Sequence, residues 1–254
     1  MKIYFLGTGT SQGIPVIGSH HSVCLSDDLK DKRLRVSVWI YDEQTSIIID
    51  CGPDFRQQML TSKCSKVDAI LFTHEHSDHT AGLDDIRPFN FKQGEIPIYG
   101  HTRVLENLKK RFDYIFETKN KYPGAPSVNP VVVINNNSFF IGKMNVTPIN
   151  AMHGNLQVFG YRIDDFAYLT DVSTIEHDEI AKLKGIKVLV INALREEPHH
   201  SHFSLQEALD FVTLVQPEKA FLTHISHLLG FHKEVQKKLP KNVFLAYDNL
   251  EITI

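Results

Sequence analysis

The chain has 254 residues, a formal net charge of −3, 42% hydrophobic residues and 22% charged residues. These values are typical of a soluble globular protein with a large core, and they exclude bulk electrostatic attraction to nucleic acid or anionic lipid. Three cysteines are too few for a disulfide framework. No apolar stretch has the length of about 18 residues that a membrane-spanning helix needs.

Strand-like segments recur along the whole chain, with helical patterns between some of them. The chain starts with a short strand-like run, Met1 to Phe5, which lacks the features of a secretory signal, so we expect a cytoplasmic protein. In order, the predicted strands are Lys2–Leu6, Arg35–Tyr41, Ser46–Ile49, Ala69–Phe72, Pro97–Tyr99, Val131–Ile134, Met144–Ile149, Val158–Ile163, Phe166–Leu169, Val188–Ile191, Ala220–Leu222 and Val243–Ala246. The predicted helices are Phe55–Leu60, Thr102–Lys110, Ile175–Lys184, Leu205–Leu214 and Lys233–Leu239. This order favours an α/β (α+β) protein with helices covering sheets over an all-β barrel.

One irregular segment interrupts this pattern. Residues Glu117 to Pro130 are polar and contain Pro123-Gly124-Ala125-Pro126, which predicts an exposed loop. The loop could also be a domain boundary. Because the candidate ligands described below lie on both sides of it, we predict a single domain over residues 1–254.

The hexapeptide His74-Glu75-His76-Ser77-Asp78-His79 directly follows a predicted strand and is dense in metal-binding side chains. His74 and His76 are two residues apart, so an extended backbone sends both imidazoles to one side. Asp78 and His79 come after the turn and can face a second position. A solvated, histidine-rich turn is the alternative, and the spacing differs from the His-Glu-x-x-His of helical zinc proteases. We predict that this loop supplies two ligands to each of two adjacent metal ions.

Two metals need further ligands, which should follow other strands. His153, Asp171 and His224 each come after a predicted strand. Phe72-Thr73-His74 and Leu222-Thr223-His224 both end an apolar strand with Thr-His, at the place where sheet proteins often bind ligands. Taken alone, each residue has an ordinary explanation: an isolated histidine is more often structural, and Asp171 could cap the helix predicted after it.

Together these residues resemble the ligand series of the metallo-β-lactamase superfamily, in the right order and over nearly the whole chain. Gly7-Thr8-Gly9 and Ile49-Asp50-Cys51-Gly52 also resemble landmarks of that superfamily. The resemblance implies a four-layer αββα sandwich with a dinuclear metal site at one edge of the sheets. It assigns His74, His76 and His153 to one metal, Asp78, His79 and His224 to the other, and Asp171 as a bridge. Asp50 would hold a ligand imidazole by its other ring nitrogen, or else form a plain turn.

Within the superfamily, the segment from Gly7 to Gly18, followed by Cys24 and Lys30 to Arg35, resembles the cyclic-phosphate phosphodiesterases of bacterial phosphonate breakdown, as does Leu222 to His227. That family carries an extra structural zinc on Cys-x-Cys-x-x-Cys and a later histidine. The matching positions here are Ser19, His21, Cys24 and His227. Two alternatives stay open: a structural zinc on His21, Cys24 and His227, with His20 or a water as fourth ligand, or a polar loop with an incidental thiol.

The function implied by this resemblance is hydrolysis of a small, in the nearest family cyclic, phosphodiester by a hydroxide that bridges two divalent metals. Nitrogen and oxygen ligands suit Zn²⁺, Mn²⁺ or Fe²⁺. His202, in a histidine-rich segment before a predicted helix, resembles the family's loop histidine and is expected to protonate the leaving alkoxide or contact the phosphate. A surface histidine cluster is the alternative for His202. Asp78 is expected to be essential for catalysis, whereas Arg87 fits a solvated face better than a pocket wall.

Three rival functions share parts of this pattern. A tRNA 3′-end processing endonuclease has the same ligands but usually a basic, glycine-rich arm, which we do not find. A thioester or lactam hydrolase would lack the phosphodiesterase-like segment near Gly7. A non-catalytic scaffold would be expected to lose ligands. We therefore expect a small phosphodiester or nucleotide as substrate, no membrane partner and, by resemblance, a homodimer.

Overall fold

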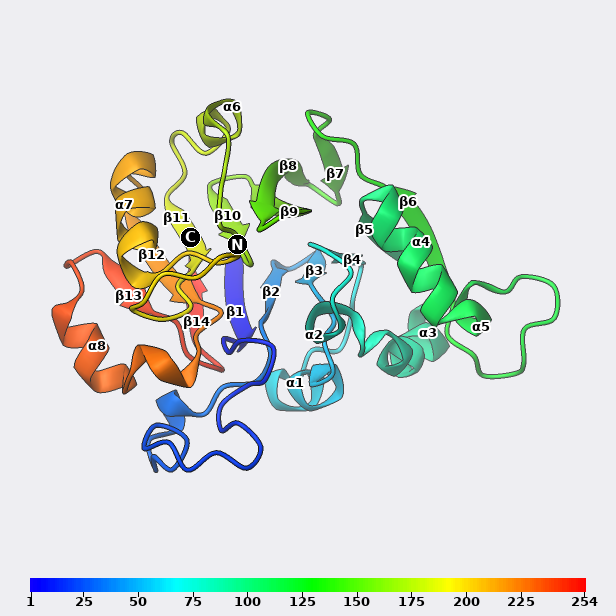
Figure 1. Ribbon diagram of the computed structural model, residues 1–254. Coiled ribbons are helices and arrows are strands. Elements are labelled where there is room, and N and C mark those ends of the chain that lie inside the picture. Colours follow the sequence, from blue (N-terminus) through cyan, green and yellow to red (C-terminus); the bar gives the residue numbers. More distant parts are fainter.

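A computed structural model describes all residues, 1–254, and contains two seven-stranded sheets that pack face to face (Figure 1). The first sheet has the spatial order β14 (Glu251–Thr253), β1 (Lys2–Gly7), β2 (Ser37–Tyr41), β3 (Ser46–Ile49), β4 (Ala69–Leu71), β5 (Ile96–Gly100) and β6 (Val128–Val132). The second has the order β13 (Val243–Leu245), β12 (Lys219–Thr223), β11 (Val188–Asn192), β10 (Phe166–Leu169), β9 (Leu156–Ile163), β8 (Met144–His153) and β7 (Phe139–Ile141).

Helices cover the outer face of each sheet. On the first sheet these are α1 (Phe55–Ser62), α3 (Arg87–Gln93) and α4 (Thr102–Arg111), whose apolar side chains share a core cluster with β3, β4 and β5. On the second sheet, α7 (Leu205–Val215) and α8 (His232–Lys238) pack in the same way. The short helices are α2 (Ser77–Thr80), α5 (Asp113–Phe116) and α6 (His177–Ala181), with 3₁₀ turns at Leu29–Asp31, Leu83–Ile86 and His227–Leu229. The four layers confirm the predicted αββα sandwich.

Strand alternation explains why the central strands are continuous apolar runs. In β3, Ile47 and Ile49 face the core between the two sheets, while Ile48 faces the helices. In β11, Val188 and Val190 face the inner core, while Leu189 and Ile191 face α7. Because successive side chains point to opposite faces, a strand buried on both faces must be apolar at every position. Such a run is therefore readable in the sequence.

The structure corrects the predicted elements at several places, mostly at sheet edges. β6 spans Val128–Val132 rather than 131–134, so the predicted loop of residues 117–130 ends at residue 127. Pro130 argued against a strand there, but β6 pairs only with β5, and proline is tolerated in an edge strand. The short edge strands β7 and β14 were not predicted. Neither was α3, where Pro88 occupies the first turn, the one helical place where its missing N–H costs nothing. In contrast, the helix predicted over residues 175–184 is limited to α6.

The topology brings the candidate ligands to one edge of the sandwich. β3, β4 and β5 run parallel in the first sheet, and β10, β11 and β12 run parallel in the second. The loops that follow β4, β10 and β12 carry His74, Asp171 and His224, respectively. Parallel strands end at a common edge, where ligands commonly bind. None of the helices has the length and apolar character needed to cross a bilayer.

Candidate metal centre

The structure brings the seven ligands predicted for the two-metal site together in two adjacent groups. The first group is His74, His76 and His153, and the second is Asp78, His79, Asp171 and His224. Within each group the ligand atoms lie within 4.8 Å of one another. Two ligands of a tetrahedral ion, each about 2.1 Å from it, are about 3.4 Å apart, so both groups have a size that a cation can occupy. A third group of the same size, His153, Asp171 and His202, shares one residue with each and places the two positions side by side.

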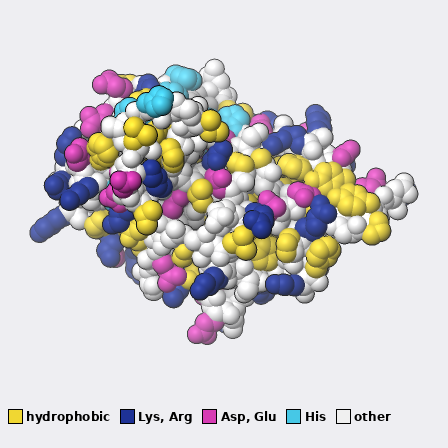
Figure 2. All heavy atoms as spheres, turned by 90° about the horizontal axis from the view of Figure 1, so that it is seen from below, with side chains coloured by type: hydrophobic (Ala, Val, Ile, Leu, Met, Phe, Trp, Pro, Cys, Tyr) yellow, Lys and Arg dark blue, Asp and Glu magenta, His cyan; other side chains and the backbone are white.

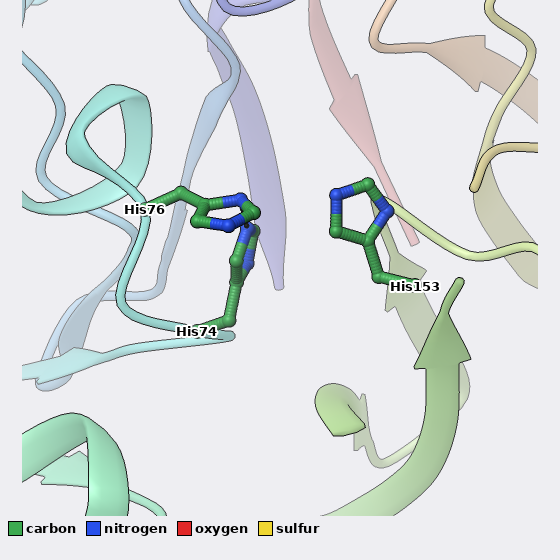
Figure 3. Close-up of side chains that lie close together, drawn as sticks. All are labelled: His74, His76 and His153. Carbon is green, nitrogen blue, oxygen red and sulfur yellow. Dashed lines mark hydrogen bonds between the residues drawn. The ribbon is translucent and has the colours of Figure 1, made fainter. Parts of the chain in front are cut away.

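The first group is built from both sheets. Figure 3 shows His74 and His76 projecting from the loop after β4, with His153 facing them from the end of β8. His74 Nε2 lies 2.9 Å from His76 Nδ1, and the rings of His76 and His153 have centroids 5.3 Å apart. His74 is fully buried, whereas His76 is exposed. The first position is therefore open to solvent on the His76 side, where a substrate can enter.

The hexapeptide has the shape that its sequence predicts. The chain is extended at His76, and α2 begins at Ser77, so that Asp78 and His79 lie in the first helical turn and belong to the second group. Gly52 makes this turn fit against the segment that follows β3. A Cβ at Gly52 would lie 2.0 Å from the backbone oxygen of Asp78, so only glycine permits this approach.

The ligand imidazoles are oriented by partners of their second ring nitrogen. Nδ1 of His79 lies 2.6 Å from Asp50, Nδ1 of His153 lies 2.7 Å from the backbone oxygen of Ser201, and Nδ1 of His74 lies 3.0 Å from Thr73 Oγ1. In metal proteins such contacts fix the tautomer and leave Nε2 free for the ion. The predicted contact of Asp50 with a ligand imidazole is therefore confirmed.

Three residues at the site have a strained backbone. Of the eight non-glycine residues with positive φ, three are Asp50, Asp171 and His224, at 64°, 57° and 53°. Each such residue costs about 1–3 kcal/mol and persists only where the surroundings enforce it. The alternative of a helix cap for Asp171 is wrong, because α6 begins later, at His177, and the Asp171 carboxylate accepts from Thr170 Oγ1 and lies 3.1 Å from His202 Nε2.

The second group has a strong negative field. Burial alone would raise the pKa of Asp171, but the neighbouring His224 and His79 outweigh burial and hold it well below its usual range. In the same way, burial would lower the pKa of His224, but Asp171 and Asp78 raise it to about 9. The pKa of His79 is raised by the same two carboxylates and by Asp50, against its burial. The carboxylates thus favour positive charge at this position, which a divalent cation would supply.

The hydrogen-bond pattern also fits a cation. The Nε2 atoms of His79 and His224 are buried and have no hydrogen-bond partner, although each lies within 3.2 Å of an Asp171 oxygen. Buried polar atoms without partners are rare, because each costs about 1–3 kcal/mol. Atoms that are close together but not aligned for hydrogen bonding are expected where their lone pairs converge on a common point. The residues therefore fit a bound metal.

His202 lies at the rim of the two groups. Its ring stacks on that of His224 with centroids 4.9 Å apart, and its Nδ1 lies 3.0 Å from Ser201 Oγ and 3.2 Å from His199 Nδ1. Burial lowers the pKa of His202 to about 4, despite the contact with Asp171. It is therefore a neutral side chain next to the site rather than part of a detached surface cluster. Its part in catalysis stays a prediction.

The residues of the predicted structural zinc are only partly brought together. The rings of His21 and His227 lie with centroids 5.0 Å apart, and Nδ1 of His227 is buried without a partner. Cys24 is buried nearby among Ile14 and Val23. These three residues do not form a group whose ligand atoms all lie within 4.8 Å, so this zinc also stays a prediction.

Three further residues, Arg87, Asn192 and Ser201, differ in how the sequence indicates their roles. Arg87 binds Asp84 and Tyr122 and its side chain is 32% exposed, as expected of a partly solvated face. Sequence reasoning missed Asn192, which is fully buried and both donates to and accepts from the backbone of Val172, the residue after Asp171. The only sequence signal for it is a polar residue ending the apolar run of β11. No local pattern indicates the role of Ser201, whose carbonyl orients His153.

Comparison with known proteins decides the family. Residues 45–225 match the Beta-lactamase superfamily domain. The chain belongs to the beta-lactamase superfamily. A crystal structure described as a new diphosphatase from the PhnP family is 35% identical, with a TM-score of 0.92 and coverage of 100% of this chain and 97% of the other. The resemblance inferred from the ligand series is thereby confirmed, and the chain has the metallo-β-lactamase fold and is similar to the PhnP family over its full length.

Two curated relatives have other names. An octanoyltransferase from Porphyromonas gingivalis is 40% identical over 256 residues, which is 100% of this chain and 52% of that protein. The ribonuclease Z of Bacillus subtilis is 29% identical over 171 residues, 65% of this chain and 49% of that protein. The chain thus spans about half the length of the curated relatives it matches. The named activity of each relative refers to the whole of that longer protein.

Proposed function

We propose that this protein hydrolyses a small phosphodiester, with two divalent cations held by the His74 and Asp171 groups described above. The observation that carries the proposal is the adjacency of two ligand groups joined by His153, Asp171 and His202. Two cations about 3.5–4 Å apart are the arrangement by which many phosphodiesterases lower the pKa of water and stabilise the attacked phosphoryl oxygens. The similarity to the diphosphatase from the PhnP family supports a phosphorus-centred reaction.

The chain's own side chains have separable parts in this scheme. The three histidines of the first group would hold one ion, while Asp78, His79 and His224 would hold the other, with Asp171 between them. Exposed His76 leaves the first position accessible to substrate. His202, which lies 3.1 Å from Asp171, would hydrogen-bond a phosphate oxygen or pass a proton to the leaving oxygen after taking one up. Zinc and manganese both suit this donor set.

A tRNA 3′-end endonuclease is the first rival, supported by the ribonuclease Z relative. Its substrate would require a basic surface of some extent. On the face shown in Figure 2, Lys and Arg side chains are interspersed with Asp, Glu and apolar side chains, and the net charge of the chain is −3. These observations favour a small substrate over a folded RNA.

An acyl thioester hydrolase is the second rival. The octanoyltransferase relative is the reason to test it, because its name refers to an acyl group and the matched region includes this whole chain. The ligand groups by themselves do not separate a carbonyl from a phosphoryl centre. The high similarity to the PhnP-family diphosphatase over full length favours phosphorus.

A parallel assay of one purified preparation separates these functions. We expect hydrolysis of a bis-aryl phosphodiester and of a cyclic ribose phosphate, and lower or no activity on precursor tRNA, octanoyl thioester and lactam. A dinucleotide and a dinucleoside diphosphate would define the leaving group. Turnover of the thioester but not of any phosphate ester would refute the proposal. Metal analysis of the same preparation is expected to give two ions per chain, or three if the His21 site is filled, and sedimentation would test the expected homodimer.

A further inference from the structure

The two halves of the first ligand group lie on different sheets, so something must hold them at a fixed separation. His74 and His76 follow β4 of the first sheet, and His153 ends β8 of the second (Figure 3). Close to His74, the connection is made by buried groups. Tyr161 Oη donates to the backbone oxygen of Phe72 at 2.7 Å, and the backbone N–H of Phe159 donates to that of Thr73 at 3.0 Å. Both contacts come from β9, the strand that pairs with β8.

Arg103 of α4 makes a third link between the two sheets, closer to the surface than the other two. Its Nε and Nη2 donate to the two carboxylate oxygens of Glu75, at 2.7 and 3.1 Å. The same Nη2 donates to the backbone oxygen of Gln157 at 2.6 Å. Along β9, residues 157, 159 and 161 thus each make a link to the loop after β4. The two buried contacts link the sheets near His74, and the Arg103 guanidinium adds a third link closer to solvent.

Both ends of this bridge are next to metal ligands. Glu75 lies between His74 and His76, and its carboxylate is bound by Arg103 of α4. Gln157 pairs with Met152, the neighbour of His153, in the β8–β9 hairpin. Arg103 therefore links the Glu75 carboxylate, next to His76, to the backbone of Gln157 on the strand that pairs with the end of β8.

Arginine is suited to this task for a geometric reason. A planar guanidinium can serve two oxygens of one carboxylate and a third acceptor at once, which the point charge of a lysine cannot. Isolated exposed ion pairs contribute little to stability. The side chains of Arg103 and Glu75 are 36% and 15% exposed, so the importance of the pair lies in what it connects. Arg111, at the other end of α4, donates to the backbone oxygen of Glu75 and to Thr80 Oγ1, which makes α4 the support of the whole loop.

We infer that Arg103 is a positioning residue that sets the separation of His153 from the His74–His76 pair, and thereby the affinity of the first cation position. The inference rests on the two-cation centre of the proposed function. In the second group, Asp171 and His224 follow strands of the other sheet, and Asp78 and His79 lie in α2, which Arg111 contacts through Thr80 and Arg103 does not. Loss of the bridge should weaken one ion selectively.

The test is a zinc titration of the wild-type protein, Arg103→Met, Arg103→Lys and Glu75→Gln, with stepwise affinities measured by competition against a chromophoric chelator. Residues that orient metal ligands typically contribute 10–100-fold to affinity. We expect Arg103→Met to lower the affinity for one ion by about that factor and to leave the other unchanged, with Arg103→Lys in between. In the His76→Ala background, Arg103→Met should have no further effect on the remaining ion. Arg87→Met, which breaks the pair with Asp84 away from the site, is the matched control.

The outcomes are distinct. Two unchanged ions in Arg103→Met, or an equal loss of both, would overturn the inference. If Arg103→Met does not fold, as judged by circular dichroism, Glu75→Gln must show the selective loss, because it breaks the same pair and keeps the arginine stem. Unfolding of both variants would make the pair a determinant of the fold and also overturn the inference. A wild-type protein that binds no divalent ion would instead refute the proposed function, independently of Arg103.

Discussion

Substituting Asp50 by asparagine is the most direct test of how the second cation position is built. Asp50 is fully buried and accepts three contacts: from the backbone N–H and Oγ1 of Thr73, at 2.9 and 2.8 Å, and from His79 Nδ1, at 2.6 Å. Asparagine has nearly the same shape and tolerates the positive φ of 64° at this position. Its amide NH₂ must however face either Thr73 or His79, both of which present donors. The backbone stays as it is, and one contact is lost.

The size of the effect can be estimated in two ways. A hydrogen bond to a charged group contributes about 1.5–3 kcal/mol. Loss of a residue that orients a ligand histidine typically costs 10–100-fold in metal affinity, which is about 1.4–2.7 kcal/mol. Because the two ranges agree, we expect Asp50→Asn to bind the ion of the Asp78–His79–His224 group about 10–100-fold more weakly. The ion of the three-histidine group should keep its affinity.

Stepwise zinc affinities from chelator competition measure this effect, and phosphodiester turnover at limiting zinc should fall in parallel. Asp164→Asn is a suitable control, because Asp164 also has a positive φ, of 51°, and lies in the β9–β10 turn away from the site. Wild-type affinity for both ions in Asp50→Asn would refute the view that the Asp50 contact sets the basicity and orientation of His79.

Further substitutions test other parts of the site and the fold. Asp78→Ala removes a ligand of the second group, so we expect hydrolysis of a bis-aryl phosphodiester to be abolished, and full activity would exclude the two-cation scheme. His202→Ala should lower turnover about 10²–10⁴-fold and leave the metal content intact, and either lost metal or unchanged turnover would contradict this role. Removing metal with a chelator should lower the melting temperature, because an ion at about 100 times its Kd adds about 2.7 kcal/mol to the stability of the folded state. Burial and the adjacent Arg33 lower the pKa of His232 to about 4, below its value of about 6.5 in an unfolded chain. Only the unfolded state therefore gains a proton as the pH falls from about 6.5 to about 4, and the wild-type protein should lose about 2 kcal/mol there relative to His232→Gln in denaturant titrations. If the free energy of unfolding changed with pH in the same way in both proteins, this explanation would be wrong.

The sequence by itself determined the layers of the fold and the identity of the ligand groups. Runs such as Ile47–Ile49 and Val188–Ile191 are apolar at every position because both faces of a central strand are covered. The spacing of His74 and His76, and the Thr-His pairs after β4 and β12, follow from strand alternation and from where strands end. These are local rules, and a single chain displays them. Edge strands such as β6 and β7 are short and half solvated, so they lack that pattern.

Only the tertiary structure decided which residues support the ligands. Arg103 reaches Glu75, 28 positions away, and Gln157, 54 positions away, and Asn192 reaches Val172, 20 positions away. Such contacts depend on how two sheets and a helix pack, which no local periodicity encodes. In the sequence, neither a metal-binding histidine nor an arginine that positions it can be told from other polar residues at the end of a helix or strand. Their roles become distinct when the packing of the layers brings them within hydrogen-bond distance.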